Sequence, residues 1–217
     1  MSTVQAILEI ARKAIEIFMR RGLRSCLVGS VASYAYGVSR TPNDVDLVVL
    51  TRAYDQEELK AMLVQADPKF YLVRSRSIYA TYKVLWYRTE DCTNCKVDVL
   101  VPGTMNIPQV PPQYIVSKAP YYLPLMPLIP HLLLKLQAWS DHGAARRLDL
   151  RLKQSTDKED IDKLVNIVLA SGDRLRSPSL GWMPESMVTA ATIRLGAYLS
   201  SRSSARKAQW RSLGFAV

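Results

Sequence analysis

The 217-residue chain has a mass of 24.4 kDa, a mean hydropathy of −0.02 and a net charge of +10. Its length fits one domain, or a small domain with a second lobe, because a single hydrophobic core rarely extends beyond about 250 residues. With 48% hydrophobic and 22% charged residues the chain is not intrinsically disordered, and three cysteines are too few for a secreted disulfide framework.

We expect neither a membrane span nor a secretory signal. Prolines and His131 interrupt the longest apolar stretch, residues 121–134, whereas a span needs roughly 18 uninterrupted apolar residues. Glu9 and Glu16 interrupt the apolar residues at the N-terminus, where a signal needs a continuous hydrophobic centre. We therefore expect a cytoplasmic protein that does not associate with membranes.

The first half of the chain predicts helices and strands in alternation. Apolar residues at spacings of three and four predict a helix over residues 4–21, which Gly22 ends. An apolar run then predicts a strand over 25–28, and Gly29 and Ser30 form the turn into a second helix over 31–36. The remaining pattern predicts a strand over 44–50, a helix over 55–65 and strands over 71–74, 78–87 and 96–101, the last two forming a hairpin.

The second half of the chain is predicted to consist of a proline-rich connector followed by helices. Eight prolines between residues 102 and 130 forbid a long helix or central strand, and mark a connector between two lobes. Helices are expected over 131–143, over 156–169 behind a capping box at Thr156–Glu159, and over 184–201. We therefore divide the chain into a sheet-containing domain, residues 1–116, and a helical lobe, residues 117–217.

Asp44 and Asp46 carry the first chemical signal. Side chains alternate along a strand, so these two carboxylates project from the same face. Side by side they repel one another unless a hard cation such as Mg²⁺ neutralises them, although such pairs also occur as solvated strand ends.

The surroundings of this pair favour the metal. Gly29 and Ser30 join a strand to a helix N-terminus, where backbone N–H groups and the helix dipole attract phosphate, and Ser30 adds a hydroxyl donor. Asp98 places a third carboxylate on a strand that can lie beside the first pair. Three convergent aspartates can hold two metal ions for phosphoryl or nucleotidyl transfer.

This pattern resembles the DNA polymerase beta-like nucleotidyltransferase superfamily, most specifically its minimal and toxin-type members. The resemblance rests on Gly29-Ser30, thirteen intervening residues, then Asp44-Val45-Asp46, with Asp98 downstream. The resemblance implies an α+β fold with a palm-like mixed sheet flanked by helices and a C-terminal helical lobe. It also implies that Asp44 and Asp46 bind Mg²⁺ and, through it, a nucleoside triphosphate. Asp98 would complete a second Mg²⁺ site and help deprotonate an acceptor hydroxyl, while Gly29 and Ser30 would hold the β- and γ-phosphates.

Two cations are further candidates for phosphate binding. Lys135 lies in an apolar helix where an unpaired ammonium is costly to bury, so it either contacts the triphosphate, as in similar enzymes, or extends to solvent along its apolar stem. Arg40, just before the acidic strand, either contacts phosphate or pairs with an acid to fix the loop.

Other polar residues have simpler explanations. Asp157 and Asp160 occupy the first turn of a predicted helix, where carboxylates favour the helix dipole. Cys92 and Cys95 form a lone Cys-x-x-Cys in a turn, for which two free thiols or an adventitious disulfide is a better interpretation than zinc.

The charge distribution bears on the acceptor. Residues 117–217 hold 15 Lys and Arg against 8 Asp and Glu, and no acid follows Glu185. This favours a polyanion such as RNA over a polycationic small molecule, although a merely soluble basic surface also fits. The resemblance to toxin-type relatives implies a transfer RNA end as one such acceptor. The rival to an enzyme is a non-catalytic nucleotide- or RNA-binding module of the same fold.

Overall fold

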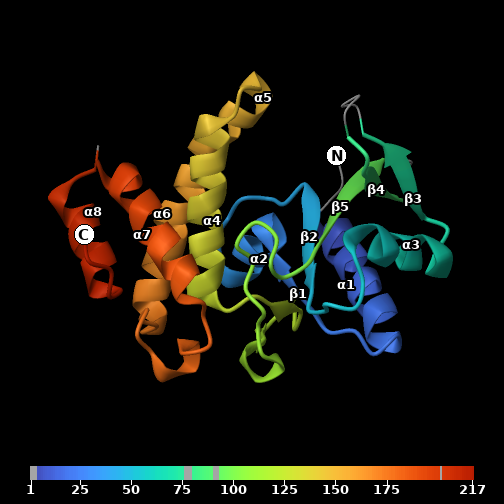
Figure 1. Ribbon diagram of the computed structural model, residues 1–217, viewed down its shortest axis with the longest axis horizontal. Helices are drawn as coiled ribbons and strands as arrows, with labels where there is room; N and C mark the ends of the chain where they lie inside the picture. The colour runs from blue at the N-terminus through green and yellow to red at the C-terminus, as the bar shows by residue number, and fades with distance from the viewer. Residues whose placement is uncertain (1–3, 76–79, 90–92, 201) are drawn as a thin grey trace. The chain divides into compact units, whose positions relative to one another are not determined.

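The computed structural model describes residues 4–75, 80–89, 93–200 and 202–217 (Figure 1). The chain divides into two compact units. The first extends to Ala35 and resumes over Ser39–Met126, and the second comprises Tyr36–Val38 and Pro127–Val217. The division thus falls after residue 126 instead of 116, because the residues between them add two short strands to the sheet of the first unit.

The first unit contains a seven-stranded mixed sheet with the strand order β3-β4-β5-β2-β1-β7-β6. The strands are β1 (Ser25–Val28), β2 (Asp44–Val49), β3 (Phe70–Arg74), β4 (Lys83–Arg88), β5 (Asn94–Leu100), β6 (Val116–Ser117) and β7 (Pro124–Leu125). Strand β2 pairs parallel with β5, and β1 with β7, while the other neighbours are antiparallel. The predicted β4–β5 hairpin is confirmed.

Three helices belong to this sheet: α1 (Val4–Arg20), α2 (Gly29–Tyr36) and α3 (Gln56–Ala66). Asp55 and Glu58 form a reciprocal capping box that starts α3. Helices α1 and α3 contact each other as well as β2 and β5 respectively (Figure 1). The strand residues that share their core alternate with polar ones, so that Val45 and Val97 are buried while their neighbours on β2 and β5 face the other side.

The second unit is helical and includes the 3₁₀ turn η2 (Pro178–Leu180). Its helices are α4 (Leu128–Ala144), α5 (Leu148–Arg151), α6 (Lys153–Ser171), α7 (Glu185–Leu199) and α8 (Ser204–Ser212). Helix α4 packs against α6 and α7 around Leu136, Leu164 and Leu195, all fully buried. Helix α8 closes one end of this core with Trp210, whose ring meets Phe215 edge-on at 5.3 Å between centroids.

These observations confirm the predicted α+β fold with a mixed sheet followed by a helical lobe. Several local predictions differ from the structure. The strand expected over 78–87 begins at Lys83, with residues 78 and 79 outside the described residues, and the helix expected over 131–143 begins at Leu128. Thr156 does not cap a helix, because α6 already begins at Lys153. The helix over 184–201 is also not the last, since α8 follows it. Among the described residues no helix has both the length and the hydropathy needed to cross a bilayer.

Candidate functional site

The three predicted carboxylates lie on one face of two adjacent strands. Asp44 and Asp46 are half-buried on β2, separated by the buried Val45. Strand β5 runs parallel beside β2, and the Cα partner of Asp46 is Asp98. Paired residues project to the same side of a sheet and neighbouring strands lie about 4.8 Å apart. The register therefore gives the three side chains neighbouring positions on the same face.

Ser30, the second residue of α2, orients the first of these acids. Its hydroxyl donates a hydrogen bond to Asp44 Oδ1 at 2.9 Å. The hydroxyl proton is directed to this carboxylate, and the predicted contact of Ser30 with phosphate remains a prediction. The backbone N–H groups of the first turn of α2, which have no partner within the helix, would then be the donors available to an anion.

Gly29 allows the second acid to lie directly against the turn. Its φ is +63°, a region that favours glycine, and a Cβ atom built there would lie 1.8 Å from Asp46 Oδ2. Any side chain at this position would collide with the Asp46 carboxylate. The glycine is therefore required both by the backbone conformation and by the close approach of Asp46.

Asp98 has a cationic partner that our sequence analysis did not identify. Lys96, two residues earlier on β5, brings its Nζ to 2.6 Å from Asp98 Oδ2. Burial alone would lower the pKa of Lys96, but the negative charges of Asp98, Asp46 and Asp44 outweigh it and raise the pKa above its ordinary value. The spacing contained the signal, since residues two apart on a strand share a face.

These contacts bear on whether the three carboxylates could bind a metal ion. Carboxylate oxygens are the ligands that Mg²⁺ prefers, so the donor set fits this ion chemically. Within the described ranges, however, no three His, Cys, Asp or Glu side chains form a group that could hold a metal ion. Asp44 is held by Ser30 and Asp98 by Lys96. The metal assignment of the three aspartates remains a prediction.

Cys95 lies near the acids, but its thiol is unreactive. Burial, with smaller contributions from the charges of Asp44 and Asp46, raises the pKa of the Cys95 thiol to about 12. The thiol therefore stays protonated near neutral pH, which suits neither a nucleophile nor a zinc ligand. Cys92 lies outside the described residues. Arg40 is half-buried in the loop between α2 and β2, and its contact with phosphate remains a prediction.

Lys135 belongs to the helical unit, where it is buried in an ion-pair cluster. Its Nζ lies 3.0 Å from Asp160 Oδ2 and 3.7 Å from Asp157 Oδ1, and only 9% of its side chain is exposed. His142 Nδ1 in turn lies 2.5 Å from Asp157 Oδ2. Lys135 therefore does not extend to solvent, and the two aspartates explain its burial without a phosphate. A contact with the triphosphate remains a prediction.

The same cluster corrects our interpretation of the two aspartates. We assigned Asp157 and Asp160 to the first helical turn, where the dipole would account for them. That placement was wrong, because α6 starts at Lys153 and both carboxylates are buried against Lys135. Their role is structural, as expected, but it arises from pairing with a cation.

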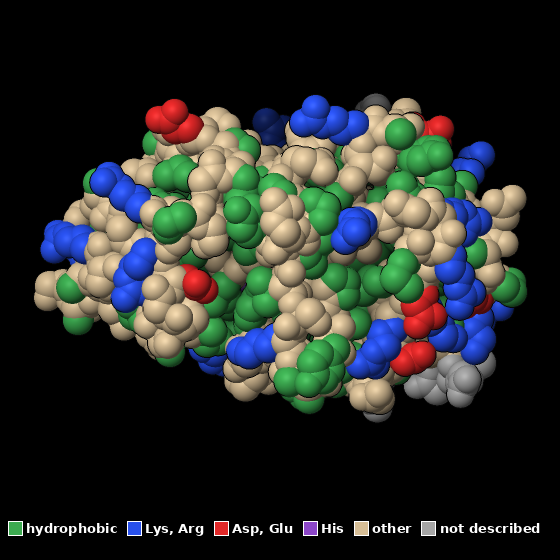
Figure 2. Space-filling view, turned by 90° about the horizontal axis from the view of Figure 1, so that it is seen from below, with side chains coloured by type: hydrophobic (Ala, Val, Ile, Leu, Met, Phe, Trp, Pro, Cys, Tyr) green, Lys and Arg blue, Asp and Glu red, His purple; other side chains and the backbone are tan. Residues whose placement is uncertain are grey.

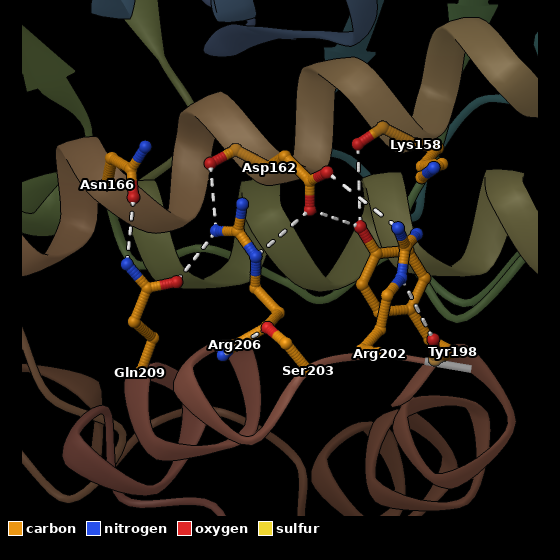
Figure 3. Close-up of polar contacts among 8 residues, drawn as sticks. All are labelled: Lys158, Asp162, Asn166, Tyr198, Arg202, Ser203, Arg206 and Gln209. Carbon is orange, nitrogen blue, oxygen red and sulfur yellow. Dashed lines mark hydrogen bonds and ion pairs between the residues drawn. The ribbon is translucent and has the colours of Figure 1, made fainter. Parts of the chain in front are cut away.

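The basic C-terminal residues are partly neutralised within the helical unit. Asp162 on α6 accepts a hydrogen bond from the Tyr198 hydroxyl at 2.7 Å, and its carboxylate lies 3.4 Å from Arg206 and 4.0 Å from Arg202 (Figure 3). The guanidinium of Arg202 also stacks over the Tyr198 ring at 4.4 Å. Two of the five Lys and Arg residues that follow Glu185 thus hold α7 and α8 against α6. These five residues are Arg194, Arg202, Arg206, Lys207 and Arg211.

Positive charge is also dispersed elsewhere. On the face shown in Figure 2, Lys and Arg side chains are spread among uncharged ones, with a few acids between those at one end. Net charge alone therefore does not define where a polyanion would bind.

Comparison with solved structures identifies the fold. The chain matches an antigenic nucleotidyltransferase-like protein from Paracoccidioides brasiliensis with a TM-score of 0.65 and 15% identity, covering 99% of this chain and 95% of the other. The chain has a nucleotidyltransferase-like fold. At 15% identity the likeness establishes this fold and not an activity.

Other solved structures match with TM-scores below 0.5 and carry no argument about the fold or the function. Terminal uridylyl transferase 4 from Trypanosoma brucei with bound GTP matches with a TM-score of 0.37 and 14% identity, covering 93% of this chain and 68% of that one. CdnC from E. coli MS115-1 with ATP matches with a TM-score of 0.30 and 12% identity, covering 94% and 88%. No family model matches the sequence, and no curated protein does.

Proposed function

We propose that this protein transfers a nucleoside monophosphate from a nucleoside triphosphate to an acceptor hydroxyl and releases pyrophosphate. The observation that carries the proposal is the register of β2 and β5, which pairs Asp46 with Asp98 beside the Gly29 turn. A nucleotidyltransferase-like fold supports it but does not define a reaction, because unrelated activities share folds.

The proposal gives each residue a specific task. Asp44 and Asp46 would hold Mg²⁺, with Asp98 completing a second site, and the metal would neutralise the charge of the triphosphate and of the attacking and leaving oxygens. Ser30 orients Asp44 through its hydrogen bond. The N-terminus of α2, opened by Gly29, would receive the β- and γ-phosphates.

The bond changes follow from these positions. The acceptor oxygen attacks the α-phosphorus and forms a new P–O bond, while the bond between that phosphorus and the bridging oxygen to the β-phosphate breaks. Asp98 takes the proton of the acceptor hydroxyl, and pyrophosphate leaves with the electron pair of the broken bond. Lys96 would hold the Asp98 carboxylate in position before the substrate arrives.

RNA is the acceptor that the charge favours. The chain carries a net charge of +10, with most of the excess after residue 116, which suits a polyanion better than a polycationic small molecule. Pairing of Arg202 and Arg206 with Asp162 leaves this excess unchanged, because Asp162 is already counted in it.

A pyrophosphate-release assay tests the proposal. The protein is incubated with each nucleoside triphosphate, Mg²⁺ and total RNA, and the variants Asp44→Asn and Asp46→Asn are compared with it. We expect both variants to lose at least about 100-fold in rate while retaining the wild-type melting temperature. Asp141→Asn, which changes an exposed carboxylate in the helical unit, serves as the matched control and should remain active. Undiminished release by Asp46→Asn would reject the metal assignment.

One observation favours the alternative, a non-catalytic binding module. Asp98 is paired with Lys96, and no three acids form a metal-binding group in the part of the chain that the structure describes. Such a module would show a nucleotide-dependent thermal shift but no pyrophosphate release under any of these conditions.

A further inference from the structure

The sheet face that carries the acids continues onto β4 and β3. Asp44 pairs with Lys96, Lys96 with Trp86, and Trp86 with Tyr71. Paired residues project to the same side, so these four side chains form one row across four strands. The row leads from the first carboxylate to the edge strand of the sheet.

The aromatic part of this row is accessible. On β3 and β4 the residues facing the helices, Phe70, Leu85 and Tyr87, are buried, whereas Tyr71 and Trp86 on the opposite face are only half-buried. The exposed Arg88 lies on that same face, and its guanidinium carbon is 5.3 Å from the centre of the Tyr71 ring. Two flat rings and a guanidinium plane thus lie next to one another.

Charge on these strands favours an anionic partner. Neither β3 nor β4 contains an acidic residue. Arg88 shares the face of the two rings, whereas Arg74 and Lys83 pair with each other on the helix-facing side of the sheet. Cations contact phosphates, and aromatic and guanidinium planes stack on unpaired bases, which is the combination that single-stranded nucleic acid requires. Duplex RNA offers no exposed base faces and would not use the rings.

We infer that Tyr71, Trp86 and Arg88 form a stacking platform for the end of a single-stranded RNA acceptor. The inference rests on the proposed function and specifies its acceptor. The Gly29 turn follows β1 on one side of the acids, the platform lies on the other side, and Asp98 stands on β5 between them. The triphosphate and the acceptor would therefore approach from opposite sides, and the terminal hydroxyl would reach Asp98 as its preceding bases stack on β4 and β3.

Fluorescence anisotropy of a labelled single-stranded RNA of about eight nucleotides tests the platform. Binding is measured in EDTA, where no transfer can occur, for the wild-type protein, Trp86→Leu, Arg88→Gln and the control Tyr54→Leu. Tyr54 is 40% exposed and lies beyond the end of β2 opposite the acids. We expect Trp86→Leu to weaken binding roughly tenfold, Arg88→Gln to weaken it and reduce its salt dependence, and Tyr54→Leu to bind as the wild type does.

The outcomes separate the platform from the proposed reaction. If the wild type binds duplex RNA as tightly as single strands, or if Arg88→Gln and a folded Trp86→Leu both keep full affinity, the platform is refuted even when pyrophosphate is released. If the platform variants lose affinity but the wild type releases no pyrophosphate, the platform holds and the catalytic proposal fails. Arg88 is exposed, so its replacement keeps the test valid should Trp86→Leu not fold.

Discussion

Replacing Lys135 with methionine tests whether this ammonium stabilises the helical unit or serves a phosphate. Lys135 Nζ lies 3.0 Å from Asp160 Oδ2, and the two side chains are 9% and 1% exposed. Methionine keeps most of the volume but leaves the Asp160 carboxylate buried without its counter-charge. Breaking a buried ion pair in this way typically costs about 3–5 kcal/mol, a large part of the stability of a small protein.

Urea denaturation followed by circular dichroism measures this cost. We expect Lys135→Met to lower the free energy of unfolding by about 3 kcal/mol, and Asp160→Asn to lower it as well, since it leaves the ammonium without its nearest acid. The double variant should lose less than the sum of the two, because neither charge is then left alone. Lys153→Met, at the exposed start of α6, is the control. A loss below about 1 kcal/mol for Lys135→Met, together with weaker nucleotide binding, would refute the structural explanation.

Three further changes test other contacts. Gly29→Ala should displace the Asp46 carboxylate and abolish pyrophosphate release while lowering stability by only about 1–2 kcal/mol, and a fully active variant would contradict the close approach. Burial lowers the pKa of His131 in the folded protein to about 3, whereas the ordinary value, which applies to the unfolded chain, is about 6.5. Between these two pH values the unfolded chain binds a proton that the folded protein does not bind. The free energy of unfolding should therefore fall as the pH drops from about 6.5 toward 3, and His131→Leu should reduce the slope of this fall by up to ~1.4 kcal/mol per pH unit. If the free energy of unfolding, measured by urea denaturation, depends on pH in the same way for both proteins, this explanation is wrong. Asp162→Asn weakens the acceptor of the Tyr198 hydroxyl and removes the charge that pairs α8 with α6, which should cost about 1–2 kcal/mol in the same denaturation assay, and unchanged stability would show that these contacts contribute nothing.

Local periodicity was enough to predict the elements around the acids. Alternation along a strand put Asp44 and Asp46 on one face, and the structure places them there. The same alternation applies to Lys96 and Asp98, so their proximity was available from the sequence. What the sequence could not supply was the parallel pairing of β2 with β5, which depends on a connection of many residues and sets Asp46 beside Asp98.

Local sequence patterns did not predict the contacts between distant residues in the helical unit. A capping-box pattern at Thr156 predicted a helix start, but α6 already begins at Lys153, and Asp157 and Asp160 pair with Lys135 from within the helix. No helical or strand period links Lys135 to residues more than twenty positions away. A charged residue in an apolar helix indicates that a partner of opposite charge is needed, but only the tertiary structure identifies that partner.

Transfer of a radiolabel from the α-phosphate measures the central claim most directly. The protein is incubated with α-labelled nucleoside triphosphates, Mg²⁺ and a cell extract, and the macromolecules are separated and tested for label. We predict that an RNA acquires the label with the wild-type protein and Asp141→Asn but not with Asp46→Asn. Equal labelling of RNA by Asp46→Asn, or no labelling of RNA by the wild-type protein, would contradict nucleotidyl transfer to RNA at this site.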